Sequence, residues 1–552
     1  MSVSPETQKG YLFFALLITL GVAAVVLLRG FEEDRFDLLD AVPMDADMVV
    51  YVPNISELGG RLQPAVDRLG LGRHSRSILR RVNSRLGFNP FREAQLERRG
   101  LRPKEGVVLY APPGERLAVA ILGIGDIPTF EKSLLQLLGA GSGARLGEKR
   151  HENGVRVHVA EERGRPVAAW TYRGDVVFVS TGPGAVERVG AGAGCSRGGV
   201  RANRWFSQGE EAVWQGSQLR LWASSDSIEA LPHNLRTATE AYSVGISVAP
   251  THLSARVWVG LSGSARSIVD VLRKEMGEDG SSFDVSRNIL TGRAHIDLVR
   301  AWSLAELVGL PAALLDVSQH LSKQGLSMKR DVLPLFDGAF EINAGLSEAG
   351  SLDPNKMHMG LTPSFLDFLD LIVSASVTDE ERAQTTLPKI ASTVTSVAGD
   401  NLEVVRIDDL KAYRLRLHPN FVATVGLREG TLVLANREGS YVNAMEGLSS
   451  RKKEPEETEG LVPADGSIGG QGALKASLSV PNLISAIHHL PRASIGDGAT
   501  ARMLRSASTL FHHSTDNLNR VNASLKAHRF GAILEIHADI GSEDIFGLPP
   551  GE

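Results

Sequence analysis

MVVYVPNI, residues 48–55, combines the two patterns that recur most often along this chain, a strand-favouring run and a residue that can cap a helix. The β-branched and aromatic residues of its first half favour a strand whose side chains alternate between two faces. Asn54 follows, and its side chain can accept hydrogen bonds from the free N–H groups of a first helical turn that opens at the apolar Ile55. The stretch therefore predicts a strand, a cap and a helix in direct succession.

The same strand–cap–helix corner is predicted at three further places. Each has a β-favouring run, then Asp or Asn, then an apolar residue, and they lie at residues 219–228 (LRLWASSDSI), 294–298 (AHIDL) and 476–483 (ASLSVPNL). Longer similarities accompany them, because residues 100–104 (GLRPK) resemble 325–329 (GLSMK) and residues 174–180 (GDVVFVS) resemble 430–436 (GTLVLAN). These paired landmarks predict an internally duplicated chain.

The predicted fold class is α+β: an N-terminal transmembrane helix followed by a duplicated body of antiparallel-type sheets packed with helices. Helices are expected at 128–138 and 379–397, where apolar residues recur at helical spacing after a strand-like run. The predicted domains are a short N-terminal tail (1–10), the anchor (11–28), a first α+β repeat (40–200), a second α+β repeat (215–448), a linker or exposed loop (449–472) and a C-terminal α+β block (473–540). The last block is either a partial third repeat or the closing elements of the second.

The uncharged run from Tyr11 to Leu28 (YLFFALLITLGVAAVVLL) predicts the membrane anchor. As a helix with ~1.5 Å of rise per residue it extends about 27 Å, close to the ~30 Å thickness of the hydrocarbon layer. It is longer than the usual apolar core of a signal peptide and runs into Arg29 without a small-x-small cleavage site, which favours an uncleaved anchor. The Lys and Arg residues on its two sides do not decide the orientation of the body.

Composition indicates a folded body, since 43% of the residues are hydrophobic and 22% are charged. A formal net charge of -5 without a domain-wide basic stripe argues against nucleic-acid binding. The single cysteine, Cys195, excludes an intrachain disulfide. It lies in the glycine-rich stretch 190–199 (GAGAGCSRGG), which is interpreted as a linker, and Cys195 is interpreted as an incidental thiol.

The sequence predicts no catalytic, cofactor-binding or metal-ligating residue. The richest metal-ligand set is histidine, but adjacent helical residues point about 100° apart, so one member of a pair faces away from a shared site. Other candidates fail on their context, as chance matches or as turns and helix starts. The residues considered are His488-His489, His512-His513, His528, His537, the Ser-x-x-Lys patterns at Ser449 and Ser450, His151-Glu152, the carboxylates at 379–381 and 408–409, and the glycines at 190–194.

Two segments gather bulky apolar residues at close spacing, namely 302–317 and 361–373 (LTPSFLDFLDLIV). They could line a groove for a lipid chain or a partner, although packing in a core is the favoured interpretation.

Three stretches carry a resemblance to a known family: residues 42–47 (VPMDAD), 86–91 (LGFNPF) and 331–338 (DVLPLFDG). Over about residues 40–450 the chain resembles, by pattern, the bacterial envelope proteins grouped as domain of unknown function 3352. This resemblance implies an extracytoplasmic, membrane-anchored, duplicated α+β body without an established activity. It favours an orientation with the N-terminus inside and the body outside.

The predicted function is therefore that of a single-pass protein of a bacterial cytoplasmic membrane, whose periplasmic or extracytoplasmic body is non-catalytic and binds a partner protein, a lipid or a wall component. Its predicted partners are the membrane, through Tyr11 to Leu28, and an envelope protein or lipid, with no nucleic acid and no cofactor. The alternative is an extracytoplasmic hydrolase whose site is assembled from scattered polar residues. That alternative predicts a cleft in which, for example, a histidine is hydrogen-bonded to a carboxylate.

Overall fold

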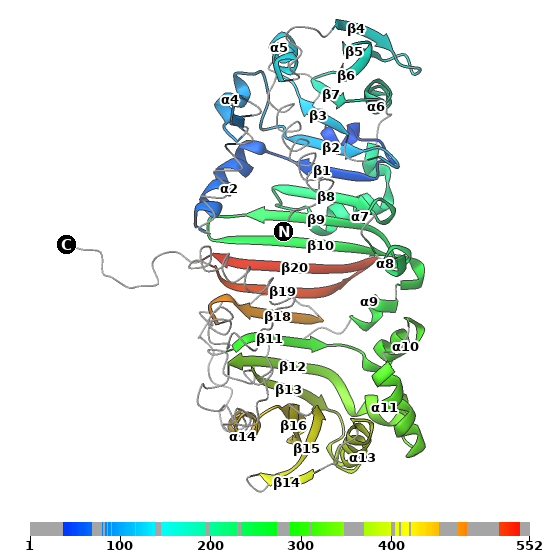
Figure 1. The fold of residues 1–552 in the computed structure, drawn as a ribbon, viewed down its shortest axis with the longest axis vertical. Helices are drawn as coiled ribbons and strands as arrows, with labels where there is room; N and C mark the ends of the chain where they lie inside the picture. The colour runs from blue at the N-terminus through cyan, green and yellow to red at the C-terminus, as the bar shows by residue number, and fades with distance from the viewer. Residues whose placement is uncertain are drawn as a thin grey trace, which may run out of the picture. The chain divides into compact units, whose positions relative to one another are not determined.

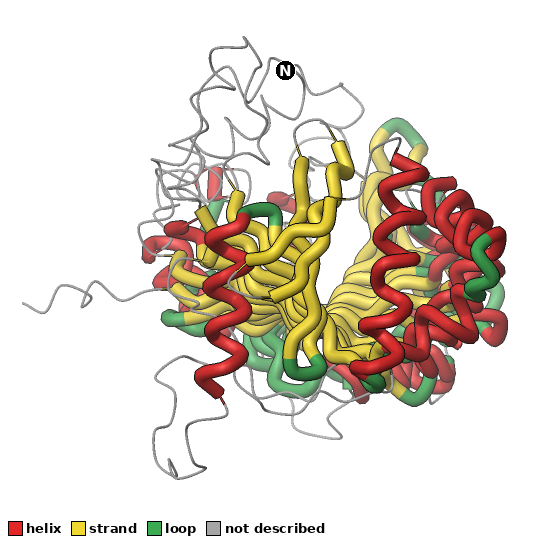
Figure 2. Tube along the Cα trace, turned by 90° about the horizontal axis from the view of Figure 1, so that it is seen from below, coloured by secondary structure: helices red, strands yellow, loops and turns green. Residues whose placement is uncertain are grey.

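The chain divides into two compact units, Met1–Ala265 (unit 1) and Arg266–Glu552 (unit 2), in a computed structural model (Figure 1). Within each unit, helices lie along an antiparallel sheet (Figure 2). The structure describes residues 37–68, 80, 83–84, 87–89, 91–115, 118–137, 145–194, 199–228, 231, 233–265, 267–272, 288–308, 312–346, 369–398, 403–407, 410–418, 421–451, 473–482 and 518–540.

The described strands of unit 1 form one antiparallel sheet in the order β4-β5-β6-β7-β3-β2-β1-β8-β9-β10. They are β1 (Met48–Val52), β2 (Val107–Ala111), β3 (Val119–Gly123), β4 (Arg145–Arg150), β5 (Arg156–Glu162), β6 (Arg165–Arg173), β7 (Val176–Thr181), β8 (Leu219–Ser224), β9 (Thr239–Val248) and β10 (His252–Leu261). The valine-rich and leucine-rich runs of β2 and β3 are buried along their whole length, as expected for central strands covered on both faces.

Helices cover both faces of the sheet in unit 1. They are α2 (Ile55–Arg68), α4 (Glu93–Glu97), α5 (Ile127–Leu137), α6 (Ala185–Ala193), α7 (Arg204–Val213) and α8 (His233–Ala238), with the 3-10 turns η1 (Leu38–Ala41), η2 (Gly199–Ala202), η3 (Ser225–Ser227) and η4 (Gly263–Ala265). Ile55, Leu96 and Phe130, from α2, α4 and α5, are at most 1% exposed in a core on one face. On the other face Phe206 of α7 packs edge-on against Trp214 and Trp222, with ring centroids 5.0 and 5.6 Å apart.

The described strands of unit 2 form a second antiparallel sheet in the order β14-β15-β16-β17-β13-β12-β11-β18-β19-β20. They are β11 (Asn288–His295), β12 (Phe336–Leu346), β13 (Leu369–Val377), β14 (Glu403–Ile407), β15 (Leu410–His418), β16 (Phe421–Arg428), β17 (Thr431–Ala435), β18 (Leu474–Ser479), β19 (Leu518–His528) and β20 (Gly531–Ile540). The helices are α9 (Ser267–Val271), α10 (Leu298–Val308), α11 (Ala312–Lys323), α13 (Glu380–Ala398) and α14 (Glu438–Arg451), with the short turns η5 (Met328–Val332) and η6 (Leu333–Leu335).

The two sheets have the same strand order, so that β1 to β10 correspond in sequence to β11 to β20. The four strand–cap–helix signals of the sequence fall on β1, β8, β11 and β18, which occupy equivalent places in the two units. Two of the caps act as expected, because Asn54 Oδ1 accepts from the Glu57 N–H at 3.0 Å and Asp297 Oδ1 accepts from the Arg300 N–H at 3.0 Å.

The predicted fold class is nevertheless wrong. It placed separate α+β repeats behind a transmembrane helix, whereas one antiparallel sheet dominates each unit, and β8, assigned to the second repeat, pairs with β1 in the sheet of unit 1. Strand propensity is a local property, but the choice of partner strand is set by long-range register and burial. None of the helices in the described part of the chain is long and apolar enough to cross a membrane. The run from Tyr11 to Leu28 lies outside the described residues.

The glycine-rich stretch 190–199 is not a linker in its first half, which belongs to α6. Gly190 lies against the ring of His151 and Gly192 against the hydroxyl of Tyr110, so a side chain at either glycine would clash. These glycines let the helix approach its neighbours closely. Cys195 lies outside the described residues, as do residues 452–472 of the expected linker, whose first residues instead end α14.

Candidate binding face of unit 2

Strands β12, β11, β18, β19 and β20 of unit 2 share a face made of apolar side chains. Directly paired residues of antiparallel strands place their side chains on the same face, and alternation extends that face along each strand. Leu290 pairs with Ala344 and with Leu478, and Ala294 pairs with Phe340 and with Leu474. This surface is named the apolar face, and its large members are Leu290, Phe340, Ile342, Leu474, Leu478, Val521, Leu525, Leu534 and Ile536.

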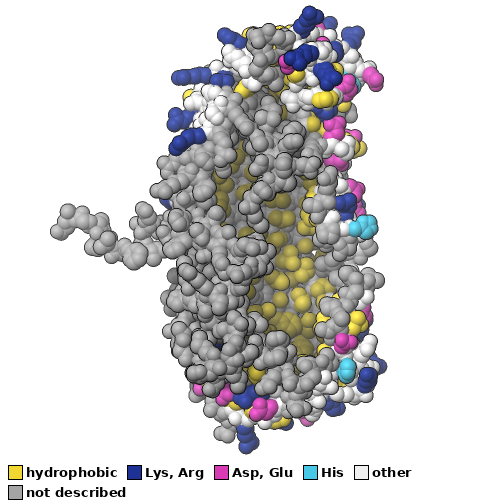
Figure 3. Space-filling model, in the orientation of Figure 1, with side chains coloured by type: hydrophobic (Ala, Val, Ile, Leu, Met, Phe, Trp, Pro, Cys, Tyr) yellow, Lys and Arg dark blue, Asp and Glu magenta, His cyan; other side chains and the backbone are white. Residues whose placement is uncertain are grey.

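The apolar face is partly exposed to solvent, unlike a hydrophobic core. Leu290 is 38% exposed, Ile342 is 41% exposed and Leu474 is 38% exposed, while its other large members are half-buried. Figure 3 shows hydrophobic side chains gathered along the floor of a hollowed surface. Contiguous exposed apolar surface on a folded sheet is typical of a site that binds an apolar ligand or partner.

The opposite face of the same strands is polar. Arg293 pairs with Glu341 on one side and with Lys475 on the other, and Lys475 pairs with Ser524. Glu341 is 8% exposed and lies within an ion-pair distance of 3.8 Å from Arg293. Asn343, which is 2% exposed, donates to Glu341 Oε1 at 3.2 Å. These five strands are thus amphipathic, with their charged and hydrogen-bonded groups on one face.

The polar row continues across β19 and β20. Lys526 Nζ lies 2.9 Å from Glu535 Oε1, and the Ser524 hydroxyl lies 3.5 Å from the other oxygen of Glu535. Because these charges are paired with one another, the row is a satisfied hydrogen-bonding surface rather than a set of free ligands.

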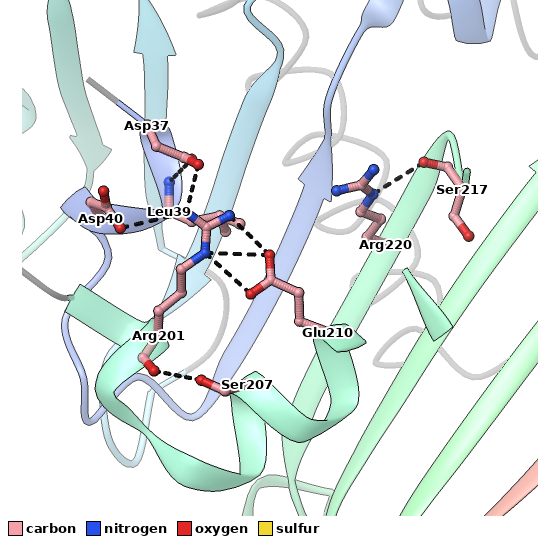
Figure 4. A network of polar contacts seen from close by, with 8 residues as sticks. All are labelled: Asp37, Leu39, Asp40, Arg201, Ser207, Glu210, Ser217 and Arg220. Carbon is pink, nitrogen blue, oxygen red and sulfur yellow. Dashed lines mark hydrogen bonds and ion pairs between the residues drawn. The ribbon is translucent and has the colours of Figure 1, made fainter. Parts of the chain in front are cut away.

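Unit 1 contains a separate polar network around Arg201 (Figure 4). Its guanidinium lies 2.6 Å from Asp37 Oδ2, 2.9 Å from Glu210 Oε1 and 3.6 Å from Asp40 Oδ1. Hydrogen bonding to Glu210 raises the pKa of the Arg201 guanidinium above its ordinary value. Asp37 also caps η1, because its carboxylate accepts from the Leu39 N–H at 3.0 Å. The network therefore ties the first described residues of the chain to α7.

A second polar group in unit 1 surrounds Glu131 of α5. Glu131 Oε1 accepts hydrogen bonds from the Tyr172 hydroxyl at 3.1 Å and from the Trp170 indole N–H at 3.3 Å, and burial with the nearby Glu131 charge raises the pKa of Tyr172. His158 stacks on Trp170 with ring centroids 5.7 Å apart. Trp170 is only 2% exposed, so this group joins α5 to the sheet and offers no open site for a substrate.

The candidate residues from the sequence do not gather into one site. The adjacent pairs His488-His489 and His512-His513 lie outside the described residues, as do residues 408–409. Asp379 caps α13 by accepting from the Arg382 N–H at 2.9 Å, which is a structural role. His151 lies in the turn between β4 and β5 and packs against Gly190.

Among the described residues, no group of three or more His, Cys, Asp and Glu side chains is arranged to hold a metal ion. Two contacts between a histidine and a carboxylate are too long for hydrogen bonds, at 3.8 Å from His158 to Glu148 and 3.8 Å from His537 to Asp539. Neither pair has the geometry that the hydrolase alternative predicts.

The two segments in which the sequence is rich in apolar residues supply parts of elements that neighbour the strands of the apolar face. Segment 302–317 supplies most of α10 and the start of α11, and the described end of segment 361–373 supplies the start of β13. The residues of β18, β19 and β20 were missed as site residues. Their signal was the alternation of apolar and polar residues in LKASLS, residues 474–479, and in VNASLKA, residues 521–527.

Comparisons with known proteins add little to this geometry. No family model and no curated protein matches the chain. The structure of crystal form IV of TP0453 is 14% identical over 44% of this chain and 89% of that chain, with a TM-score of 0.25. The structure of crystal form III is 13% identical over 45% of this chain and 91% of that chain, with a TM-score of 0.23, and that of crystal form I is 11% identical over 45% and 90%, with a TM-score of 0.24.

Proposed function

We propose that unit 2 binds the acyl chain of a lipid on its apolar face, and that the chain is a non-catalytic envelope protein attached to the membrane through Tyr11 to Leu28. The observation that carries the proposal is the exposure of Leu290, Ile342 and Leu474 on a face that is apolar across five strands. The envelope location rests on the N-terminal run and on the resemblance to domain of unknown function 3352.

The chemistry of the apolar face favours hydrocarbon over a protein partner. Protein interfaces depend on Trp, Tyr and Arg anchors and on a hydrogen-bonding rim. The large described members of the apolar face are aliphatic apart from Phe340. The arginines and lysines of these strands, namely Arg293, Lys475, Arg520 and Lys526, are on the opposite face. A hydrocarbon chain needs no hydrogen-bond partner, so this surface suits it.

The expected energy is sufficient for binding. Each buried methylene contributes about 0.8 kcal/mol, so a chain with about a dozen buried methylenes gains on the order of 10 kcal/mol. Ordering the ligand and losing its overall motion cost at least about 4 kcal/mol of this gain. The remainder, at most about 6 kcal/mol, corresponds to a dissociation constant on the order of tens of micromolar.

Photo-crosslinking in the intact membrane tests the proposal. The full chain is expressed in cells that incorporate a fatty acid with a photoreactive diazirine, and crosslinked peptides are identified by mass spectrometry. We expect adducts on β11, β12 and β18. Ile342→Gln and Leu474→Gln each place an amide in the apolar contact, which costs about 1–3 kcal/mol and lowers the yield about fivefold or more.

Val404→Gln is the matched control, because Val404 of β14 is also in unit 2 and is 59% exposed but lies outside the apolar face. Its crosslinking yield should equal that of the unchanged protein. Equal yields in all three variants, or adducts spread evenly over unit 2, would contradict lipid binding at the apolar face.

A further inference from the structure

The N-terminal half of α11 carries an apolar stripe that continues beyond its packing contacts. Leu314, Val317 and Leu321 are spaced i, i+3 and i+7, so they lie on one side of the helix. Leu321 is fully buried and Val317 is half-buried, but Leu314 is 43% exposed. The neighbouring Leu315 is 42% exposed. The stripe thus leaves the protein interior and enters the solvent at the start of the helix.

The preceding helix, α10, also exposes an apolar residue. Val299 in its first turn is 38% exposed. Trp302, one turn later, is half-buried, and its indole N–H donates to Glu306 Oε1 at 2.7 Å. The other oxygen of Glu306 lies 2.6 Å from Lys329 Nζ. An aromatic ring with an apolar body and a satisfied polar end is typical of groups at a membrane–water interface.

The exposed charges beside these apolar residues balance one another. Arg300 is 3.5 Å from Asp297, and α11 exposes both Asp316 and Lys323. Such a surface has no basic excess to recognise anionic lipid, so its attraction to a bilayer has to come from burial of apolar side chains.

We propose that Val299, Leu314 and Leu315 form a lip that contacts the surface of a phospholipid bilayer, from which lipid passes to the apolar face of unit 2. This inference rests on the proposed function. α10 begins at Leu298, close after the end of β11 at His295, so the lip is continuous in the chain with a strand of the apolar face.

The N-terminal run favours a bilayer, rather than another protein, as the surface that the lip contacts. Only residues 29–36 separate Leu28, the end of that run, from Asp37, the first described residue. Even fully extended, these residues span at most about 30 Å. If Tyr11 to Leu28 attach the chain to a membrane, as proposed above, a bilayer is the apolar surface at the highest local concentration.

Site-specific fluorescence on the full chain tests the contact. Cys195→Ser removes the only native thiol, and Leu314→Cys or Leu315→Cys then carries an environment-sensitive fluorophore in vesicles of phosphatidylcholine. We expect a blue shift and quenching by phosphatidylcholine with a doxyl group on its acyl chain. Leu146→Cys and Val404→Cys, at positions 60% and 59% exposed, are the matched controls and should show neither effect. Quenching at 314 and 315 no greater than at 146 and 404 would overturn the lip.

A second measurement separates the lip from the binding face. In Leu314→Ser/Leu315→Ser, uptake of a fluorescent phospholipid from neutral vesicles should slow about tenfold or more, since two large apolar contacts with the bilayer are lost. Binding of a soluble fatty acid should stay unchanged. If fatty-acid binding falls equally, the two leucines line the binding face and the lip is wrong. If the unchanged protein binds no fatty acid while the fluorophore is still quenched, the proposed function fails and the membrane contact stands.

Discussion

Unit 1 and unit 2 have the same strand order but differ in how far the faces of their sheets are covered. In unit 1 both faces are packed, one against Ile55 and Phe130 and the other against Phe206 of α7. In unit 2 the equivalent central strands leave Leu290 and Ile342 exposed on one face. Their other face carries paired charges and amides. One topology therefore supports both a closed core and an open apolar surface.

The difference in burial has an energetic consequence for the two units. A sheet buried on both faces gains the full hydrophobic contribution of its side chains and is the stable version. Leaving large side chains such as Leu290 and Ile342 about two-fifths exposed gives up part of the roughly 1.5–3 kcal/mol that full burial of each would contribute, and such a cost is typical of a functional surface.

The largest predicted effect distinguishes the packed face of unit 1 from the open face of unit 2. Phe206→Ala empties a core position and should lower the free energy of unfolding of unit 1 by about 3–5 kcal/mol. Ile342→Ala removes a side chain that is 41% exposed and should cost less than about 1 kcal/mol. Native-state hydrogen exchange of amides in β9 and β19 reports the two units separately. Similar losses in both variants would abolish the proposed contrast.

Glycine substitutions sharpen the same comparison at the helices. A Cβ at Gly209 of α7 would lie 2.6 Å from Ser243 Cβ and 3.2 Å from Trp258 Cε3, so Gly209→Ala should cost about 1–3 kcal/mol through overpacking. In α14 of unit 2, a Cβ at Gly439 meets nothing within 4 Å. Gly439→Ala should therefore raise stability by about 0.5–1 kcal/mol, because alanine is the better helix former. Thermal unfolding measures both, and a stabilised Gly209→Ala would show that α7 is loosely packed.

A smaller effect is expected at the network that ties the start of unit 1 to α7. Arg201→Met keeps the length of the side chain but leaves Asp37 and Glu210 without their shared cation. We expect a loss of about 1–2 kcal/mol, because the Arg201 side chain is still 35% exposed and solvent screens part of the interaction.

The control for Arg201→Met is Arg61→Met, which removes a surface pair with Glu57 one helical turn away in α2. That pair should contribute less than about 0.5 kcal/mol. Urea unfolding compares the two variants. If Arg201→Met costs no more than its control, the network does not hold η1 in place.

The sequence predicted local features of this fold better than long-range ones. The corners at Asn54 and Asp297 were visible because strand propensity and capping depend on neighbouring residues. The pairing of β8 with β1 was not visible, since register depends on distant strands. Predicting the apolar face requires both the local alternation of residues and the long-range pairing of strands. Alternation in β18 and β19 gives each strand an apolar side, but only pairing shows that five such sides join.

The smallest predicted effect at neutral pH concerns Tyr441, which packs α14 onto the sheet of unit 2. Tyr441 is 1% exposed, and among the described residues its hydroxyl has no hydrogen-bond partner. Tyr441→Phe should change stability by less than about 0.5 kcal/mol or raise it, because no hydrogen bond is lost.

Burial raises the pKa of Tyr441 to about 12. An acid whose pKa is higher in the folded state than the ordinary value of about 10 stabilises the fold fully below pH 10, and this contribution is lost between about pH 10 and 12. Tyr441→Phe should therefore lose less stability than the unchanged protein over that interval in alkaline unfolding curves, and parallel curves would show that the hydroxyl is solvated.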